Sequence, residues 1–561
     1  MTVKRRESPR MADPPLPGTY PQGTPWNGRH GPHAWPGDAP ATAGADRMTN
    51  VDQTFLKYNA LDSACMMDIY NAIKSDVDAT FADTYALTMD VFPVLMFMQT
   101  RGVRVSHDLL QQTKLDVLEK IKQKQAELDE LVGHHLNVDS PKQCCNYFYI
   151  EQDVKPYLNK AGRPTVDDKA LQRLVRATST RRAFPEAKLI QDIRGLSKLH
   201  GTYLDIEFDE DNRMRGSYNP RGTKFGRLSS SKTVFGTGMN FQNLPQDFKK
   251  FLIPDPGYAF IELDKRQAEW VVVAYASGDA NMISAIERGE DVHVHTASLM
   301  YGVDGETVRY DNKLIGHLTD PEAIRDIRES DHRLTNLIGK FPRTMSARQA
   351  GKKSNHGLNY DEGYRGFSLI NEIPESEGKK MVDTYHKIYP GIRLWYEVIK
   401  RQLGKDRMLE NYFGRRVRFI GQWGDDLFKS AYSMIPQSTV VDSLNGGMAK
   451  IYDDLWITKE LNLDILAQVH DSVLMQIPIK WLEDKETYNK LWGRLDDYTS
   501  PQIEYNGREF KIASDLKMSC SNWGGHHSEH NPHGMQDVET HADVLKIIKN
   551  WRESCGDSGT E

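Results

Sequence analysis

The stretch Ile261-Glu262-Leu263-Asp264 ends an apolar run in a carboxylate, just before a helical pattern from Gln267 to Tyr275. A second carboxylate lies far along the chain, in Gln468-Val469-His470-Asp471-Ser472. Apolar runs flank this second stretch on both sides, which predicts a β-hairpin with Asp471 at its tip. The sequence therefore predicts two strands, each of which presents one aspartate.

A cationic segment lies between the two aspartates. Arg348, Lys352, His356 and Tyr360 follow one another at four-residue intervals, so a helix would display them along one broad face. Arginine can hold a phosphate in a fork, and lysine can act as a point charge or a proton donor. This segment is therefore suited to bind a triphosphate.

The two aspartates are suited to bind divalent cations. Magnesium takes oxygen ligands, and two such ions held close together can lower the pKa of an attacking hydroxyl and stabilise a leaving oxygen. Asp264 and Asp471 would supply these ligands, with two Mg²⁺ ions as the cofactor and Mn²⁺ as a substitute. Paired carboxylates and a cationic helix together predict phosphoryl transfer from a triphosphate.

At these residues the chain resembles the family A DNA polymerases. Motif A of that family, D-Y-S-Q-I-E, corresponds to Asp264-Lys265-Arg266-Gln267-Ala268-Glu269. Motif B, R-x-x-x-K-x-x-x-F-G-x-x-Y-G, corresponds to Arg348, Lys352, His356-Gly357 and Tyr360-Asp361, and motif C, H-D-E, to His470-Asp471-Ser472. Other stretches of the family follow in order, among them Gly226-Arg227-Leu228-Ser229-Ser230, Asn240-Phe241-Gln242-Asn243-Leu244-Pro245, Asp291-Val292-His293 and Pro436-Gln437-Ser438-Thr439. Such a colinear set rarely arises by chance.

The resemblance implies an α+β chain with the right-hand polymerase fold, in which the palm is an antiparallel sheet and the fingers and thumb are helical. The expected order is a thumb at 86–220, palm with motif A at 221–279, fingers at 280–425, palm with motif C at 426–524 and a tail at 525–561. The fingers would contain a surface insertion at about 303–341.

The resemblance also implies roles for individual residues. The catalytic set would be Asp264, Asp471 and Lys352, with the backbone carbonyl of Lys265 as a further metal ligand and Lys352 as the group that protonates the pyrophosphate. The residues that would contact the incoming nucleotide are Arg348, Lys352, His356, Tyr360, His293, Gln267 and Glu269. Those that would contact primer-template DNA are Arg227, Gln437, His470, Gln468, Asn243 and Arg415, partly in the minor groove.

Glu269 distinguishes two related classes of enzyme. In the family this glutamate closes over the 2′ position of the nucleotide, so a ribose hydroxyl would collide with it. Single-subunit phage RNA polymerases share the right-hand fold and often have H-D-S in motif C, as this chain has with Ser472. Because Glu269 acts directly on the sugar, DNA synthesis is favoured over RNA synthesis.

The chain departs from the family pattern at two positions of motif B. His356 replaces a phenylalanine or tyrosine that packs against the nucleotide sugar. Imidazole can donate or accept a hydrogen bond, so His356 either confers a tyrosine-like tolerance of dideoxynucleotides or is only a flat spacer. Asp361 stands where the family has glycine, so the local turn departs from the family pattern while the predicted helix does not.

A catalytically inactive DNA-binding relative is an alternative. The motifs differ from the family at Lys265, Arg266, His356 and Ser472, and loss of activity could explain such drift. Both aspartates, the arginine and lysine of motif B, and Glu269 are nevertheless present. An active enzyme is therefore favoured.

The N-terminal part of the chain is unlike the rest. Residues 1–47 are rich in proline and glycine and lack periodicity, which predicts a disordered arm. The segment 48–85 has a helical pattern, and its Tyr58-Asn59-Ala60-Leu61-Asp62 resembles the last motif of a 3′→5′ exonuclease domain. The partner motif is missing, so we expect a remnant helix that packs on the thumb and no proofreading by this chain.

Composition sets the expectations for compartment and partners. With 561 residues, 39% of them hydrophobic, the chain can bury several cores. No apolar run has the length of a membrane span, and five cysteines without paired spacing fit a reducing cytoplasm, that of the host cell if the protein is viral. The net charge of -6 means that DNA binding would depend on local basic clusters. The expected partners are primer-template DNA, deoxynucleotides and a separate exonuclease, helicase/primase or processivity factor.

Two further helices are predicted outside the motifs. In the thumb, apolar residues at helical spacing predict a stripe of core packing, formed by Leu115, Leu118, Ile121, Leu128 and Leu131. In the tail, the apolar pattern from Val538 to Trp551 predicts a helix that docks on the body. The histidines before it lie in a glycine-rich segment that offers no supporting ligand shell, so no metal site is expected there.

Overall fold

The computed structural model describes residues 46–159, 161–175, 182–318, 321–339, 344–371, 373–527 and 529–555, with side chains from residue 54 onward. The chain divides into two compact units, Met1–Ser75 and Asp76–Glu561. Residues 1–45 of the predicted disordered arm lie outside the described residues, so that prediction is not tested.

In the first unit the described residues belong to one helix, α1 (Asp46–Asp76). Every residue from Thr54 to Ser75 is exposed within this unit, and the packing of the helix on the thumb stays a prediction. The helical stretch Thr54–Arg101 is long and apolar enough to cross a membrane, by length and composition only. This differs from the expectation that no such stretch exists.

The palm is a five-stranded antiparallel sheet with the strand order β14-β13-β6-β10-β9. Its strands are β6 (Tyr258–Lys265), β9 (Asp464–Val469), β10 (Ser472–Pro478), β13 (Ser514–Ser519) and β14 (Gln536–Val538). The predicted antiparallel sheet is confirmed. The edge strand β14 lies in the segment expected to be a separate tail. The sequence does not predict this strand, because three residues are too few to show an alternating pattern.

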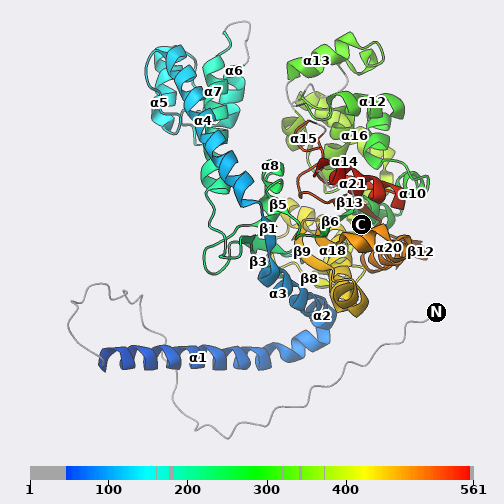
Figure 1. Cartoon of the computed structure of the whole chain (residues 1–561). Coiled ribbons are helices and arrows are strands. Elements are labelled where there is room, and N and C mark those ends of the chain that lie inside the picture. The colour runs from blue at the N-terminus through cyan, green and yellow to red at the C-terminus, as the bar shows by residue number, and fades with distance from the viewer. Residues whose placement is uncertain are drawn as a thin grey trace, which may run out of the picture. The chain divides into compact units, whose positions relative to one another are not determined.

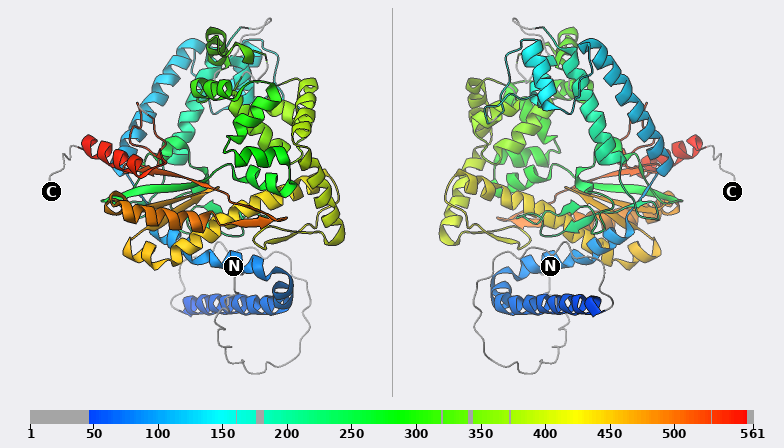
Figure 2. Two further views of the ribbon diagram at one scale, coloured as in Figure 1. Left: turned by 90° about the vertical axis from the view of Figure 1, so that its right-hand side faces the viewer. Right: turned by 90° about the vertical axis from the view of Figure 1, so that its left-hand side faces the viewer.

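One face of the palm sheet is covered by helices (Figure 1; Figure 2). The long helix α18 (Asp425–Asp453) contacts α20 (Lys485–Thr499), and α19 (Ile479–Glu483) contacts α21 (His541–Ser554). In α21, Val544, Ile547 and Ile548 are buried in the same core as the palm strands. The predicted tail helix therefore exists and docks on the body, as expected.

The fingers are helical and have their own core. Helix α9 (Ala268–Ser277) is apolar on most sides apart from Glu269 in its first turn, and it lies inside this core, which is where such a helix is stable. A two-stranded hairpin, β7 (Met408–Glu410) and β8 (Arg416–Arg418), follows the last finger helix. The finger helices are α9 (Ala268–Ser277), α10 (Ala280–Glu287), α11 (Val292–Tyr301), α12 (Gly305–Ile315), α13 (Pro321–Ser330), α14 (Ala347–Leu358), α15 (Tyr364–Asn371), α16 (Glu375–Ile388) and α17 (Pro390–Asp406).

The thumb is built on the long helix α4 (His107–Val132), which packs on α7 (Pro185–Lys198). The predicted apolar stripe is partly wrong, because Leu115 is 62% exposed and Leu131 is 49% exposed. The buried positions of α4 are Leu110, Val117 and Leu128. Their wider spacing places all three on one face of the helix. The other thumb helices are α5 (Pro141–Asn146), α6 (Asp168–Val175) and the short turns η2 (Tyr147–Glu151) and η3 (Leu199–Leu204).

Short elements connect the thumb and the palm. They are η1 (Val77–Phe81), α2 (Ala82–Asp90), α3 (Phe92–Arg101), α8 (Gln246–Lys249), η4 (Phe241–Asn243), the sheet of β1 (Val103–Val105), β2 (Arg213–Met214) and β5 (Leu252–Ile253), and the hairpin of β3 (Ser217–Asn219) and β4 (Ser229–Ser231). The remaining elements are η5 (Thr335–Leu337), η6 (Trp456–Glu460), β11 (Ile503–Tyr505) and β12 (Arg508–Phe510).

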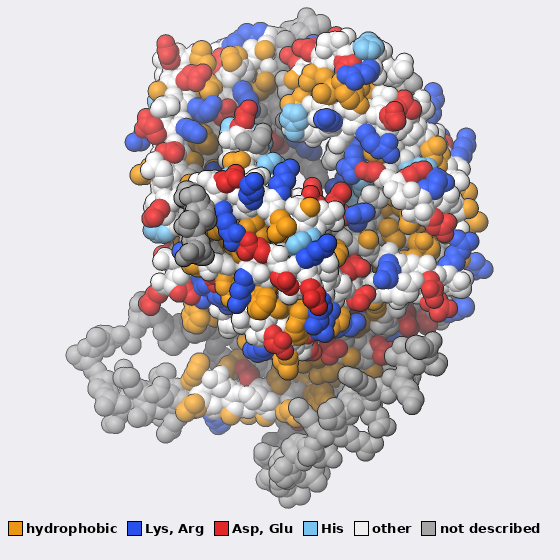
Figure 3. Space-filling view, turned by 45° about the vertical axis from the view of Figure 1, so that its right-hand side comes forward, with side chains coloured by type: hydrophobic (Ala, Val, Ile, Leu, Met, Phe, Trp, Pro, Cys, Tyr) orange, Lys and Arg blue, Asp and Glu red, His pale blue; other side chains and the backbone are white. Residues whose placement is uncertain are grey.

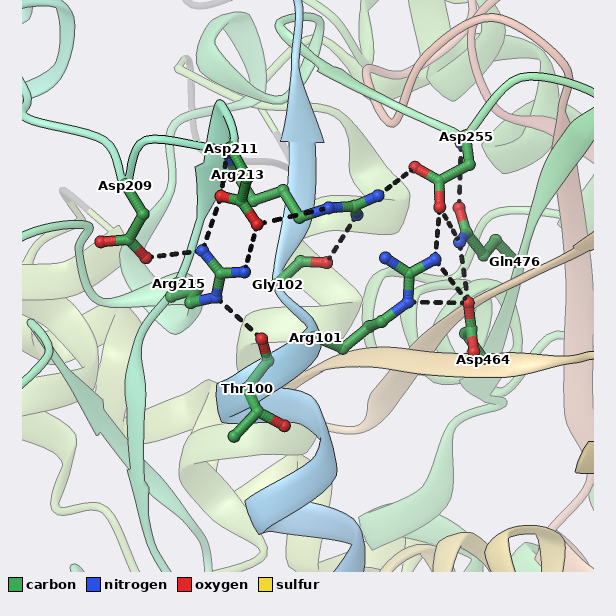
Figure 4. A network of polar contacts seen from close by, with 10 residues as sticks. All are labelled: Thr100, Arg101, Gly102, Asp209, Asp211, Arg213, Arg215, Asp255, Asp464 and Gln476. Carbon is green, nitrogen blue, oxygen red and sulfur yellow. Dashed lines mark hydrogen bonds and ion pairs between the residues drawn. The ribbon is translucent and has the colours of Figure 1, made fainter.

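An ion-pair network ties these connecting elements to the palm (Figure 4). Arg101 pairs with Asp255 and with Asp464, whose Oδ2 lies 3.0 Å from the arginine Nε. Arg213 also donates to Asp255, at 2.6 Å. The network joins α3, β2, the segment after β5 and β9. It therefore connects residues that lie far apart in the sequence.

Charged side chains are mixed on the face drawn in Figure 3, where Lys and Arg are interspersed with Asp and Glu. This pattern agrees with a chain of modest net charge.

Candidate active site

The two aspartates lie next to each other at one end of the palm sheet. Asp264 on β6 pairs in register with Ser472, the residue that follows Asp471. The backbone N–H of Lys265 donates to the carbonyl of Asp471, with 3.0 Å between the atoms. His470 takes a left-handed conformation, with φ of 52°, so His470 and Asp471 form the two-residue turn between β9 and β10. The predicted hairpin with Asp471 at its tip is confirmed.

Both carboxylates sit where a negative charge is costly. Desolvation and the nearby Glu262 and Asp471 carboxylates raise the pKa of Asp264 to about 6, although its side chain is 47% exposed and Lys517 opposes the shift. Burial also raises the pKa of Asp471, against the effect of Arg227. The Oδ1 atom of Asp471 is buried and accepts no hydrogen bond from the described residues. An orphaned carboxylate oxygen beside a second carboxylate is what a bound cation would satisfy.

A three-residue network lies beside the aspartates. The Tyr360 hydroxyl donates to Oε2 of Glu269 at 2.5 Å, and Arg227 pairs with Oε1 of the same carboxylate. A terminal nitrogen of Arg227 also lies 3.9 Å from Oδ1 of Asp471. The structure thus brings together predicted nucleotide-binding, DNA-binding and metal-binding residues that come from four separate segments.

The cationic segment forms helix α14, which Ser346 caps by accepting a hydrogen bond from the backbone N–H of Gln349. The Lys352 and His356 side chains are exposed. Tyr360 lies just beyond the helix, since α14 ends at Leu358, so the four-residue pattern overestimates the helix by about half a turn. Asp361 follows with φ of 61°, a conformation that aspartate tolerates, so it can stand where the family has glycine.

Helix α11 lies against α14, contains the predicted residue His293 and contacts a second one, Gln267. Gly351 permits this contact, because a Cβ there would collide with the backbone carbonyl of His293. Burial lowers the pKa of His293 to about 4, with a further contribution from nearby Arg348, so its imidazole is neutral near pH 7. Gln267, at the N-terminus of α9, accepts a hydrogen bond from the backbone N–H of Val292 at 3.2 Å.

Asp291 is a residue that the sequence did not single out as functional. It caps α11, and its Oδ2 lies 2.7 Å from the Nε of Arg348. Burial alone would raise the pKa of Asp291, but the pairing with Arg348 more than offsets this and holds the pKa below its usual value. Asp291 therefore sets the direction of the Arg348 side chain.

The insertion at 303–341 is not confined to the surface. Asp311 on α12 is fully buried and pairs with Arg328 on α13, with 2.9 Å between Oδ1 and Nε. The other oxygen of Asp311 accepts a hydrogen bond at 2.7 Å from the backbone N–H of Ala347, at the start of α14. The insertion thus supports the helix that carries Arg348 and Lys352.

The predicted DNA-contact residues fall into two groups. Arg227, Asn243, Gln437 and His470 are exposed or half-buried, so they are accessible. The other two, Arg415 and Gln468, are buried, and their contact with DNA stays a prediction. Arg415 is buried and pairs with Asp442 at 2.7 Å, so it has a structural role in this ion pair. Gln468 is 2% exposed, donates to the carbonyl of His470 and accepts from Gln242, so it supports the hairpin from inside.

The side chain of Lys265 lies away from the aspartate site. Its side chain points into the palm, where its ammonium donates to the carbonyls of Thr499 and Ile512. Burial lowers the pKa of Lys265 to about 7. Only its backbone carbonyl can therefore serve the aspartate site, as the sequence predicts.

Comparison with solved structures identifies the fold. The structure described as "POL domain of Pol1 from M. smegmatis complex with DNA primer-template and dNTP" aligns with a TM-score of 0.60 at 21% identity, over 77% of this chain and 69% of that chain. The fold is that of a right-hand polymerase. The family model of DNA polymerase family A matches residues 107–315 and 334–494, which is most of the chain. The chain belongs to DNA polymerase family A.

Curated relatives agree with this assignment. The thermostable DNA polymerase I of Thermus thermophilus is 28% identical over 407 residues, which cover 69% of this chain and 42% of the relative. DNA polymerase I of Treponema pallidum is 24% identical over 442 residues, which cover 75% and 39% of the two chains. The chain therefore matches about two fifths of the length of these relatives.

Proposed function

We propose that the chain is a template-directed DNA polymerase, which adds deoxynucleotides to a primer 3′ end and releases pyrophosphate. The observation that carries this proposal is the pair of aspartates on neighbouring palm strands, with Arg227, Glu269 and Tyr360 beside them. Family membership supports it.

Two divalent cations, Mg²⁺ or Mn²⁺, fit the aspartate pair. Asp264, Asp471 and the backbone carbonyl of Lys265 would hold them, and these are the oxygen ligands that hard cations take. No group of three or more His, Cys, Asp or Glu side chains within the described ranges is placed to hold a metal alone. Water and the triphosphate would therefore complete the coordination. The bound ions would activate the primer hydroxyl and stabilise charge on the leaving oxygens.

The exposed face of α14 would bind the triphosphate. Arg348 is held by Asp291 through Nε, so its terminal nitrogens would bind phosphate oxygens. Lys352 would neutralise the developing charge and protonate the pyrophosphate. His356 would pack on the sugar, and His293 and Gln267 would support this binding site from α11 and α9.

Glu269 would select the sugar. Its carboxylate is held from two sides by Tyr360 and Arg227, so it cannot easily move aside for a 2′-hydroxyl. Arg227, His470, Gln437 and Asn243 would contact the primer-template duplex near its end.

The wider role is part of the proposal. We place the protein in the cytoplasm, in phage-like replication or in repair, where it would work without proofreading of its own. A separate exonuclease, helicase/primase or processivity factor would be a further partner.

The test is extension of a labelled primer on a DNA template with Mg²⁺, with deoxynucleotides compared with ribonucleotides. Extension with deoxynucleotides alone supports the proposal. Primer-template binding without extension would instead identify an inactive DNA-binding relative, and extension with ribonucleotides would identify an RNA polymerase-like enzyme.

A further inference from the structure

A third carboxylate lies on the palm strand that carries the first aspartate. Glu262 and Asp264 are two residues apart on β6, so their side chains leave the same face of the sheet. Glu262 is only 8% exposed. A buried carboxylate is costly unless it is paired or hydrogen-bonded, so its contacts need an explanation.

The contacts of Glu262 lead to the second aspartate. Its Oε1 accepts a hydrogen bond from the Ser472 hydroxyl at 3.0 Å and another from the Trp523 indole N–H at 3.3 Å. Ser472 directly follows Asp471 and lies opposite Asp264 in the ladder. Glu262 thus connects the two strands that carry the aspartates.

The other carboxylate oxygen of Glu262 has no such partner among the described residues. Within the described part of the chain, Oε2 of Glu262 accepts no hydrogen bond, and Glu262 lines a pocket of about 570 Å³ with Lys249 and Lys517. The Lys249 ammonium lies 4.2 Å from the centre of the Trp523 ring, and the Lys517 ammonium lies 3.9 Å from the Asp264 carboxylate. Neither lysine forms an ion pair with Glu262 within 4.0 Å, so Oε2 remains available to water.

We propose that Glu262 is a positioning residue of the metal site, whose Oε2 accepts a hydrogen bond from a water bound to the divalent cation at Asp264 and Asp471. Ser472 holds this carboxylate in place across the strand pair. The inference rests on the proposed function, because it assumes that the aspartate pair binds divalent cations.

The test removes the charge and keeps the shape. Glu262→Gln retains a carbonyl oxygen that can accept from Ser472, but it loses the carboxylate. Glu186→Gln is the matched control, because Glu186 is also buried, at 4% exposure, and accepts a hydrogen bond from a tyrosine, Tyr147, in the thumb. The double variant Glu262→Gln/Ser472→Glu restores a carboxylate to the same face from the opposite strand.

The first readout does not depend on activity. Mn²⁺ binding is measured by electron paramagnetic resonance on the enzyme with primer-template DNA whose primer ends in a dideoxynucleotide. Loss of an outer hydrogen-bond partner of a metal weakens binding by about 10-fold or more, so Glu262→Gln should raise the Mn²⁺ dissociation constant by that factor. Glu186→Gln should leave it unchanged, and the double variant should recover most of the loss.

The second readout is the Mg²⁺ concentration needed for half-maximal primer extension, which should shift in the same order. Wild-type Mn²⁺ affinity in Glu262→Gln, an equal loss in Glu186→Gln, or a double variant as weak as Glu262→Gln would each overturn the inference. A wild-type enzyme that extends no primer would overturn the proposed function instead, so the two failures are distinguishable.

Discussion

The hydroxyl of Tyr360 donates a 2.5 Å hydrogen bond to Oε2 of Glu269. Tyr360 comes from the segment after α14 and Glu269 from the first turn of α9. Burial and this carboxylate raise the pKa of Tyr360 well above its usual value, so the phenol stays protonated and remains a donor. The contact fixes the carboxylate that the proposed function assigns to sugar selection.

Tyr360→Phe should therefore weaken the rejection of ribonucleotides. The variant leaves Glu269 held only by Arg227, and a lost hydrogen bond to a charged group corresponds to about a 10-fold change in selectivity. Single-nucleotide incorporation of a deoxynucleotide and its ribonucleotide gives the ratio of kcat/KM values. Tyr364→Phe on the following helix is the control. An unchanged ratio in Tyr360→Phe would show that this hydrogen bond does not contribute to sugar selection.

His356 should set the response to dideoxynucleotides. Its ring is exposed on α14 and lies 6.2 Å from the Tyr360 ring, edge to face, so one face of the imidazole is open to a sugar. We expect the wild type to incorporate dideoxynucleotides about 10-fold more readily than His356→Phe, because imidazole can offer a hydrogen bond in place of the missing 3′-hydroxyl. Equal discrimination against dideoxynucleotides by the two proteins would show that His356 acts only as a flat spacer.

The pair Asp311–Arg328 should stabilise the fingers. Arg328→Met leaves the buried carboxylate of Asp311 without its main partner, and breaking a buried pair in this way costs about 3–5 kcal/mol. Chemical denaturation measures the loss. Arg325→Met, on the same helix but exposed at its Asp326 and Glu329 pairs, should cost less than about 1 kcal/mol. Similar losses in both variants would mean that the insertion is only a surface feature.

Stability should fall in acid because of Asp255. Burial would raise the pKa of Asp255, but hydrogen bonds from Gln476 and Arg101 and the pairing with Arg213 hold it below its usual value. A group with a depressed pKa stabilises the folded state above its unfolded pKa, and this contribution is lost as pH falls through the folded value. The wild type should therefore lose stability below about pH 4 more steeply than Asp255→Asn. Parallel pH profiles of the two melting temperatures would contradict this.

Local sequence patterns predicted the hairpin end of the palm well. A polar turn between two apolar runs is a local signal, so the hairpin at Asp471 and its strands could be predicted from the residues alone. The capped helix of the cationic segment is local in the same way, although the pattern places its end about half a turn too far.

The features that depend on distant contacts could not be predicted. From the sequence alone, Arg415 is expected to be an exposed basic residue. In the structure it is buried and paired with Asp442 on α18. Leu115 fits a helical stripe, but the orientation of α4 is set by α7 and leaves it exposed. Strand β14 exists only because β13 pairs with it. In each case the partner lies far away in sequence, and no local pattern records it.

The most direct test of the account is single-turnover extension of a primer by one deoxynucleotide with Mg²⁺, in the wild type, Asp264→Asn, Asp471→Asn and Asp515→Asn. Asp515 is the control, because it lies opposite Asp264 on β13 but is paired with Arg266. We predict a loss of about 100-fold or more for each of the first two variants, and less than about 10-fold for the control. Extension at the wild-type rate by Asp471→Asn would contradict the central claim that this aspartate pair is the catalytic centre.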